Sequence, residues 1–178
     1  MKRIAFVTTI NGFGGSEFLW MKTAALASSM GHTCWASVSD RHRDVPLTKQ
    51  ITSSGVDVHF RSPVYPASTA GRLIRKIKTK LFAGNSYQNL LDFKPDVIVV
   101  NGDNFGALAN PDLRMSIQQS GAAYIHVAHG CGGIPSPELM DPAARYFGDA
   151  KAACFVATPT LQMTERHFAT HIETARIV

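Results

Sequence analysis

The side chain best placed for chemistry is that of His129, which lies between a strand-like segment and a glycine-rich loop. Residues 123–127 are typical of a strand, and residues 130–133 read Gly-Cys-Gly-Gly. An imidazole at this position can hydrogen-bond to a ligand and can carry charge near neutral pH. The alternative is a histidine bonded only to the neighbouring loop. His126 lies three residues earlier, inside the strand-like segment, and we expect it to be structural.

The turn after the first strand-like segment is the second candidate. It contains Gly14, Gly15, Ser16 and Glu17, just before a helical pattern. Glycine lets the backbone approach a ligand closely, and the free amide groups at a helix start favour a phosphate. The turn is not the dinucleotide-binding fingerprint, because Glu17 stands where the third glycine would be. We predict that it contacts a donor phosphate or an acceptor. The alternative is an ordinary tight turn.

Further polar groups follow two other strand-like segments. Asn101, Asp103 and Asn104 come after one of them, and Thr158 comes after another. Their amides, carboxylate and hydroxyl are plausible ligands for the hydroxyl groups of a sugar or an acceptor. For residues 101–104, the alternative is a strand-to-helix turn with an Asp or Asn cap.

The three cysteines suggest no chemistry of their own. Cys131 lies close to His129, but the sequence identifies no third group that would orient a thiol nucleophile, so we interpret it as a small residue of the glycine loop. Cys34 and Cys154 lie in apolar segments and are expected to pack in the core. The odd count and wide spacing indicate neither a disulfide framework nor a zinc site, and no metal or other cofactor is expected.

Alternating strands and helices must position these candidates. Strands are expected at 3–9, 33–39, 56–60, 96–100, 123–127, 153–157 and from 175, and helices at 16–30, 45–54, 69–82, 86–93 and from 158. This alternation predicts a parallel sheet covered on both faces, a Rossmann-like, doubly wound, mostly parallel α/β fold of six to seven strands. Ligands bind at the carboxyl ends of such strands, where all the candidates lie. The length of 178 residues suits one domain, 1–178, with its own core.

Local signals mark several helix ends. Gly31 and Gly55 stand where a glycine commonly ends a helix. Thr158 and Pro159 predict the start of a helix, with threonine as the N-cap and proline as the first helical residue.

Several of these segments together resemble the N-terminal half of the family 4 glycosyltransferases, which have the GT-B fold. The first strand with its Gly-Gly-x-Glu turn is similar to the opening of that family. Residues 94–98, Lys-Pro-Asp-Val-Ile, resemble its strand of a basic residue followed by Pro-Asp-Val-Ile, and residues 128–130 resemble its x-His-Gly strand end. Residues 148–158 are similar to Ala-Asp-x-Val-x-x-x-Ser, with Thr158 in the serine place. The matches follow the family's order and cover nearly the whole chain.

The resemblance implies a function. It implies the acceptor-side domain of a retaining glycosyltransferase, with His129 contacting the transferred sugar near its anomeric carbon. The donor would be a nucleotide sugar, held mainly by a C-terminal domain absent from this chain, so residues 1–178 alone are expected to be inactive. No metal is implied, and cell-surface polysaccharide or glycolipid synthesis is the expected setting. The alternative is a stand-alone Rossmann-like module that binds a nucleotide or a partner without transferring a sugar.

The segment 72–82 is basic and amphipathic. It places Arg72, Arg75, Lys76 and Lys80 on one arc of a helix and apolar residues on the other. This pattern fits an anionic membrane surface, and the family's acceptors are often lipid-linked. The alternative is a solvated helix packed on the sheet. The net charge of +5 favours anionic partners, but no nucleic acid is expected. We expect a cytoplasmic protein, peripheral on the inner face of the plasma membrane if the basic segment binds lipid.

Overall fold

The computed structural model describes residues 1–10, 12, 14–61, 87–105, 107–132 and 135–178. The strands are β1 Arg3–Thr8, β2 Thr33–Ser39, β3 Asp57–Arg61, β4 Val97–Gly102, β5 Ala123–Ala128, β6 Ala152–Phe155 and β7 Ala175–Ile177. The helices are α1 Gly15–Ser29, α2 Pro46–Ser53, α4 Gln88–Phe93, α5 Pro111–Ser120, α6 Met140–Asp149 and α7 Thr158–Phe168. Two short 3-10 helices are η1 Asp40–His42 and η2 Pro137–Leu139. The predicted helix at 69–82, with its four named basic residues, lies outside the described residues.

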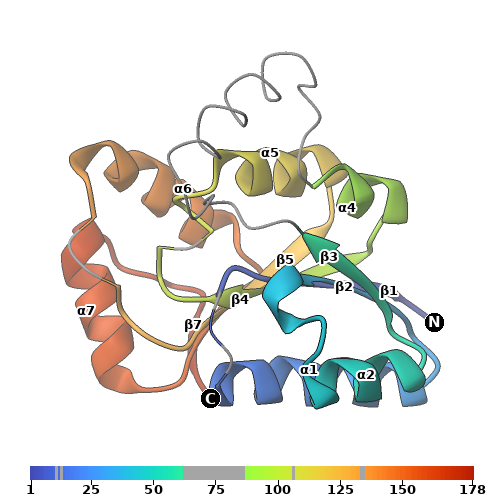
Figure 1. Ribbon diagram of the computed structural model, residues 1–178. Helices are drawn as coiled ribbons and strands as arrows, with labels where there is room; N and C mark the ends of the chain where they lie inside the picture. Colours follow the sequence, from blue (N-terminus) through green and yellow to red (C-terminus); the bar gives the residue numbers. More distant parts are fainter. Residues whose placement is uncertain (11, 13, 62–86, 106, 133–134) are drawn as a thin grey trace, which may run out of the picture.

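The strands form one parallel sheet in the order β3-β2-β1-β4-β5-β6-β7, which confirms the predicted Rossmann-like α/β fold. The chain runs outward from β1 to β3, returns to the centre at β4, and runs outward on the other side to β7. Helices α1 and α2 lie along one side of the sheet, and α4, α5 and α6 lie along the other (Figure 1). The order therefore reverses between β1 and β4, where α/β sheets commonly bind ligands.

Two apolar clusters, one on each face, hold the layers together. The strands alternate their side chains between the clusters, so neighbouring residues of β1 and β4 point to opposite faces. One cluster joins the sheet to α4, α5, α6 and α7, and includes Ala5, Val7, Ile98, Val100, Leu113, Phe147 and Phe168. The other joins it to α1 and α2, and includes Phe6, Trp20, Met21, Ala36, Val38 and Ile51. Strands buried on both faces need continuous apolar runs, which is why the sequence identified them.

Helix ends follow the local signals in two of three predicted places. Gly31 follows α1 with φ of 87°, and Gly55 follows α2 with φ of 86°, a left-handed conformation that favours glycine. The prediction that Thr158 is an N-cap is wrong by one residue. The N-cap of α7 is Ala157, no side chain caps the helix, and Thr158 is the first helical residue.

The sequence did not predict α5 and α6. Asn110 starts α5, because its side-chain oxygen accepts a hydrogen bond from the Leu113 amide at 3.1 Å. Each helix of ten residues buries few side chains; in α6 these are Ala143, Tyr146 and Phe147. Such short, sparse apolar patterns are weak signals, yet both helices complete the cover over β4, β5 and β6.

His126 lies buried in β5, which agrees with the prediction that its role is structural. Its side chain is fully buried, with Nδ1 3.1 Å from the Tyr146 hydroxyl and the ring edge-on to Phe147. Burial lowers the pKa of His126 to about 4, against smaller opposing effects of Asp103, and His129 adds to the lowering. The imidazole is therefore neutral in the folded protein at pH 7.

We expect Ile98→Ala to lower the free energy of unfolding by about 2–5 kcal/mol, because Ile98 is completely buried in the central strand β4 and the change leaves a cavity. Leu26→Ala is the control: Leu26 is 61% exposed on α1, and its truncation should change stability by less than about 0.5 kcal/mol. Urea titration followed by circular dichroism measures both. Similar values for the two variants would contradict the assigned core.

Acid should destabilise the protein through His126. The unfolded chain takes up a proton near pH 6.5, whereas the folded chain does so only near pH 4. The stabilisation is present above pH 6.5 and is lost as the pH falls to 4, by about 3 kcal/mol in total. In His126→Gln this part of the pH dependence should disappear, whereas in His171→Gln, an exposed site, it should persist. Urea titrations between pH 4 and 7.5 compare the slopes, and an unchanged slope in His126→Gln would refute the assignment.

Candidate functional site

The carboxyl ends of β1, β4 and β5 form one continuous rim. Thr8 of β1 is paired with Asn101 of β4, and Gly102 of β4 is paired with Ala128 of β5. The His129 amide extends the second pairing by donating to the Gly102 carbonyl at 2.9 Å. The three strand ends therefore place the side chains of Asn101 and His129 side by side.

His129 and Asn101 form a hydrogen-bonded pair. The Nε2 atom of His129 lies 2.5 Å from Oδ1 of Asn101. Because an amide oxygen can only accept, Nε2 carries the proton and the Nδ1 lone pair is left for another donor. Asn101 is 1% exposed, and among the described residues its Nδ2 has no hydrogen-bond acceptor. Within the described part of the chain, the pair thus has one acceptor, Nδ1 of His129, and one donor, Nδ2 of Asn101, without a partner.

Glu17 brings a buried carboxylate to the same place. Its side chain is completely buried and accepts hydrogen bonds from the hydroxyls of Thr8, at 3.2 Å, and of Ser16. Burial lowers the pKa of His129, and the negative charge of Glu17 opposes this shift. Since burial dominates, the neutral imidazole is favoured at pH 7, and the hydrogen bond to Asn101 places its one proton on Nε2.

The predicted glycine turn lies at the start of α1. Gly14 is the N-cap, has no side chain to cap the helix, and accepts from the Glu17 amide at 3.1 Å. A Cβ atom built on Gly14 or Gly15 would meet no heavy atom within 4 Å, so there is open space around the turn. The first amides of a 15-residue helix therefore lie beside the Glu17 carboxylate at the rim.

Asn104 is turned inward and fixes the loop after His129. Its Nδ2 donates to Cys131 Sγ at 3.0 Å and to Thr164 Oγ1 at 3.1 Å, and its Oδ1 accepts from the Gly132 amide at 2.8 Å. His167 lies 3.4 Å from the same sulfur. These contacts supply the neighbours of Cys131 that the sequence could not identify. They use both ends of the Asn104 amide, so Asn104 positions the loop and does not face a ligand.

Asp103 and Thr158 lie apart from the pair. Oδ1 of Asp103 accepts from the Phe105 amide at 2.9 Å in a turn, but the next described helix is capped by Asn110, so the helix cap predicted at 101–104 is wrong. Thr158 is exposed at the start of α7, after β6. Of the predicted site residues, the structure therefore brings together Ser16, Glu17, Asn101 and His129, with Gly14 and Gly15 adjacent. Within the described ranges, no three His, Cys, Asp or Glu side chains are arranged to hold a metal ion.

Sequence reasoning missed Arg61 at this rim. It ends β3, and its guanidinium donates to the main chain and hydroxyl of Ser37 in β2 and to the carbonyl of Thr8 in β1. The rule that placed the other candidates, a polar residue at the carboxyl end of a strand, applies equally to β3. Arg61 directly follows the strand predicted at 56–60, so the same rule could have identified it.

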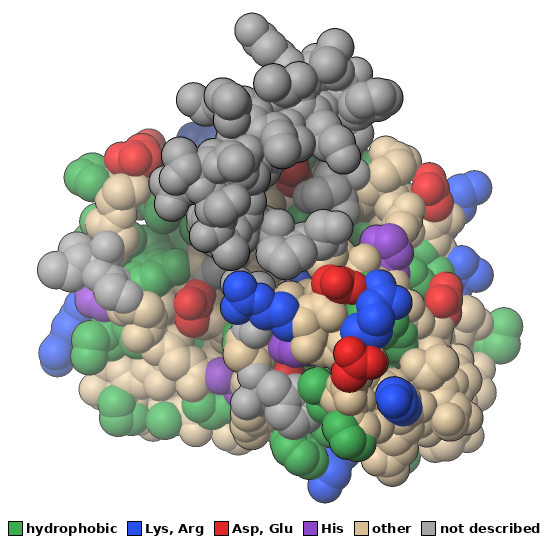
Figure 2. All heavy atoms as spheres, viewed as in Figure 1, with side chains coloured by type: hydrophobic (Ala, Val, Ile, Leu, Met, Phe, Trp, Pro, Cys, Tyr) green, Lys and Arg blue, Asp and Glu red, His purple; other side chains and the backbone are tan. Residues whose placement is uncertain are grey.

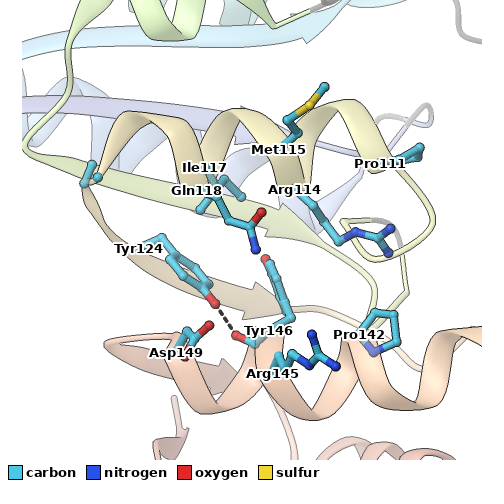
Figure 3. Close-up of a pocket in the computed structure, with 12 residues that line it drawn as sticks. Pro111, Arg114, Met115, Ile117, Gln118, Tyr124, Pro142, Arg145, Tyr146 and Asp149 are labelled. Carbon is cyan, nitrogen blue, oxygen red and sulfur yellow. Dashed lines mark hydrogen bonds between the residues drawn. The ribbon is translucent and has the colours of Figure 1, made fainter.

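A separate hollow of about 630 Å³ lies between α5 and α6, away from this rim. Arg114 of α5 and Arg145 of α6 line it together with Tyr124 and Tyr146 (Figure 3). Tyr124 lies near the beginning of β5, whereas His129 follows its end. The rim remains the candidate site because it brings together the predicted residues Glu17, Asn101 and His129.

Comparisons with known proteins agree on the fold. Neither a protein-family model nor a curated protein matches the sequence. Among solved structures, Alr3699/HepE of Anabaena, crystallised with UDP, superposes with a TM-score of 0.61 at 12% identity, over 99% of this chain and 43% of that one. A glycosyltransferase of Rickettsia africae gives 0.62 at 12% identity, over 99% and 42%. MurG of Acinetobacter baumannii gives 0.52 at 14% identity, over 87% and 41%.

The chain thus spans less than half the length of these three proteins. At such identities the likeness establishes the fold alone. This chain has the Rossmann-like α/β fold that makes up half of a GT-B glycosyltransferase.

Proposed function

We propose that the chain is the N-terminal, acceptor-side domain of a retaining, family 4 glycosyltransferase. The enzyme transfers a sugar from a nucleotide-sugar donor to a hydroxyl group of the acceptor. A second domain binds most of the donor, and the product is a cell-surface polysaccharide or a glycolipid. The motif resemblance and the fold likeness to glycosyltransferases, one of them crystallised with UDP-glucose, support this proposal.

The observation that carries the proposal is the Asn101–His129 pair. Its neutral imidazole presents Nδ1 as an acceptor for a hydroxyl group of the transferred sugar. Asn101 orients the ring, and its own Nδ2 is buried without an acceptor among the described residues. Because both groups are already oriented by their mutual bond, the hydrogen bonds to a ligand cost little reorganisation.

The start of α1 suits the donor diphosphate or the acceptor. Its first amides and the positive end of the helix dipole favour an anion, and the glycines leave room for it. The buried Glu17 carboxylate lies in the same turn, bonded to Ser16, and keeps an anion on the outer side of the helix end. A second domain facing this rim would enclose the donor and exclude water.

A stand-alone Rossmann-like binding module is the alternative. It needs no second domain and predicts tight nucleotide binding by residues 1–178 alone. The likeness to halves of larger transferases supports the transferase instead. The two differ in one measurement, calorimetric titration of the chain with UDP-glucose: the transferase domain should bind it with a Kd of about a millimolar or weaker, and a micromolar Kd would favour the module.

The charge distribution along the sequence supports attachment of the chain to an anionic membrane, where a lipid-linked acceptor would lie. Residues 62–86 hold five Lys and Arg and no acidic residue, and the remainder holds 13 of each sign. That segment therefore accounts for the whole net charge of +5. On the face shown in Figure 2, basic side chains lie among acidic ones. Among the described helices, none is long and apolar enough to cross a membrane.

We expect the chain to sediment with vesicles rich in phosphatidylglycerol and to be released by salt, since each basic residue near an anionic surface contributes about 1 kcal/mol. Replacing Arg72, Arg75, Lys76 and Lys80 by Gln should abolish binding, and replacing four Lys or Arg outside 62–86 should not. Equal sedimentation with neutral phosphatidylcholine vesicles would refute the electrostatic attachment.

In the enzyme with its donor-binding domain, His129→Ala should lower sugar transfer about a hundredfold or more, because it removes an oriented polar group at the reacting centre. Melting should change little, since His129 is only partly buried. His171→Ala, at an exposed position, is the matched control. Steady-state kinetics with the best nucleotide sugar measures the effect, and unaltered turnover in His129→Ala would remove His129 from the mechanism.

A further inference from the structure

Arg61 reaches across two strands to the candidate site. It is the last residue of β3. Its Nη1 donates to Ser37 O at 3.0 Å and to Ser37 Oγ at 2.9 Å, and Nη2 donates to the Thr8 carbonyl. The guanidinium carbon lies 5.1 Å from the centre of the Tyr87 ring. The charge is therefore held over the end of β1 by neutral partners and an aromatic ring.

Among the described residues, no carboxylate makes an ion pair with this charge. The Glu17 carboxylate accepts from the Thr8 hydroxyl, whereas Arg61 donates to the Thr8 carbonyl. The positions outside the described ranges, including 62–86, contain no Asp or Glu in the sequence. Burial lowers the pKa of Arg61, which reflects the cost of desolvating the charge. An arginine stays charged at neutral pH, so an unbalanced, largely desolvated cation is left at the rim.

One edge of the guanidinium is also unfilled. Its Nε–H has no acceptor among the described residues, and Nη2, which carries two N–H groups, has only the Thr8 carbonyl. These two groups form the parallel fork that binds a carboxylate or phosphate with two hydrogen bonds. Arg43 shows the filled case, because its Nε and Nη2 both donate to Asp40, at 2.9 and 2.6 Å. Arg61 has the same fork without the anion.

The fork lies next to the Asn101–His129 pair. Nη2 of Arg61 is bonded to Thr8, and Thr8 is paired in the sheet with Asn101. Adjacent strands are about 4.8 Å apart, so one ligand can contact both the imidazole and the guanidinium. Arg61 is partly exposed, so a ligand can reach it from the rim.

We propose that Arg61 is the anion-binding residue of this site and takes a phosphate or carboxylate group of a substrate through its open fork. The anion is either an acidic group on the sugar acceptor or the diphosphate of the donor. Only this choice of ligands rests on the proposed glycosyltransferase function. Bound there, the anion balances the buried charge and directs the rest of the substrate toward His129.

The test follows the Arg61 Nε–H signal of the 178-residue chain by NMR at constant ionic strength. We titrate glucose 1-phosphate, glucuronate, UDP and neutral glucose. The signal should shift with at least one anion, with half-saturation at about a millimolar, and should not move with glucose. Arg43 is the internal control in the same spectrum, since Asp40 already fills its fork. A response to the sugar anions assigns the group to the acceptor, and a response to UDP alone assigns it to the donor.

Two variants separate binding from a purely structural role. Arg61→Lys keeps the charge and loses the fork, and Arg61→Gln loses both. The Asn101 side-chain amide signal then reports binding, and anion affinity should fall at least tenfold in Arg61→Gln. If that variant fails to fold, Arg61→Lys and the signal of the unaltered chain still decide the question. No shift with any anion, or undiminished affinity in the variants, would make Arg61 a clamp for the strand ends only. Because transfer is not measured, loss or survival of activity in His129→Ala does not affect this outcome.

Discussion

The pairing of β1 with β4 is the constraint on which the site depends. The chain leaves β1 toward β2 on one side and returns to β4 on the other, so the strand order reverses between these two strand ends. The register sets Thr8 opposite Asn101. From there α1 supplies Glu17 and β5 supplies His129, which are 112 positions apart in the sequence but electrostatically coupled. A different strand order would separate these groups even with the same elements.

Desolvated polar groups at this rim are costly to the fold. Glu17 and Asn101 are almost wholly buried, and each is held by hydrogen bonds to neighbouring side chains. One buried donor, Asn101 Nδ2, is left without an acceptor among the described residues. A buried group without a partner lowers stability by about 1–3 kcal/mol. A ligand that supplied the missing acceptor would remove this cost, and in a low-dielectric setting its bond would be stronger than in water.

The sheet could be predicted from the sequence because buried parallel strands are continuous apolar runs, and β2 and β5 begin at their expected residues. The rim followed from the fold, which placed Asn101, His129 and Glu17 correctly beside one another. What could not be predicted depends on contacts between distant residues. Asn104 was predicted to contact a ligand, but its side-chain amide is hydrogen-bonded to Thr164, which lies 60 positions away in the sequence. Arg61 is held at the rim by its hydrogen bond to Thr8, which lies 53 positions away. Helices α5 and α6 bury few residues, so their apolar patterns are too weak to be recognised in the sequence.

The loop after β5 explains how His129 can be oriented before any ligand arrives. Glycines at 130 and 132 would leave the loop conformation loosely defined, yet Asn104 makes three hydrogen bonds to the loop. The backbone amide of Asn104 donates to the Gly130 carbonyl at 3.2 Å. Its side-chain Oδ1 accepts from the Gly132 amide, and its Nδ2 donates to Cys131 Sγ. Phe105 closes against Gly132, where an added Cβ would lie 2.5 Å from the ring. His129 thus has a fixed backbone on one side and Asn101 on the other. Because the entropy cost of ordering the loop and His129 is part of folding, a substrate meets a preformed Asn101–His129 pair. More of the substrate's binding free energy is then available to stabilise the transition state.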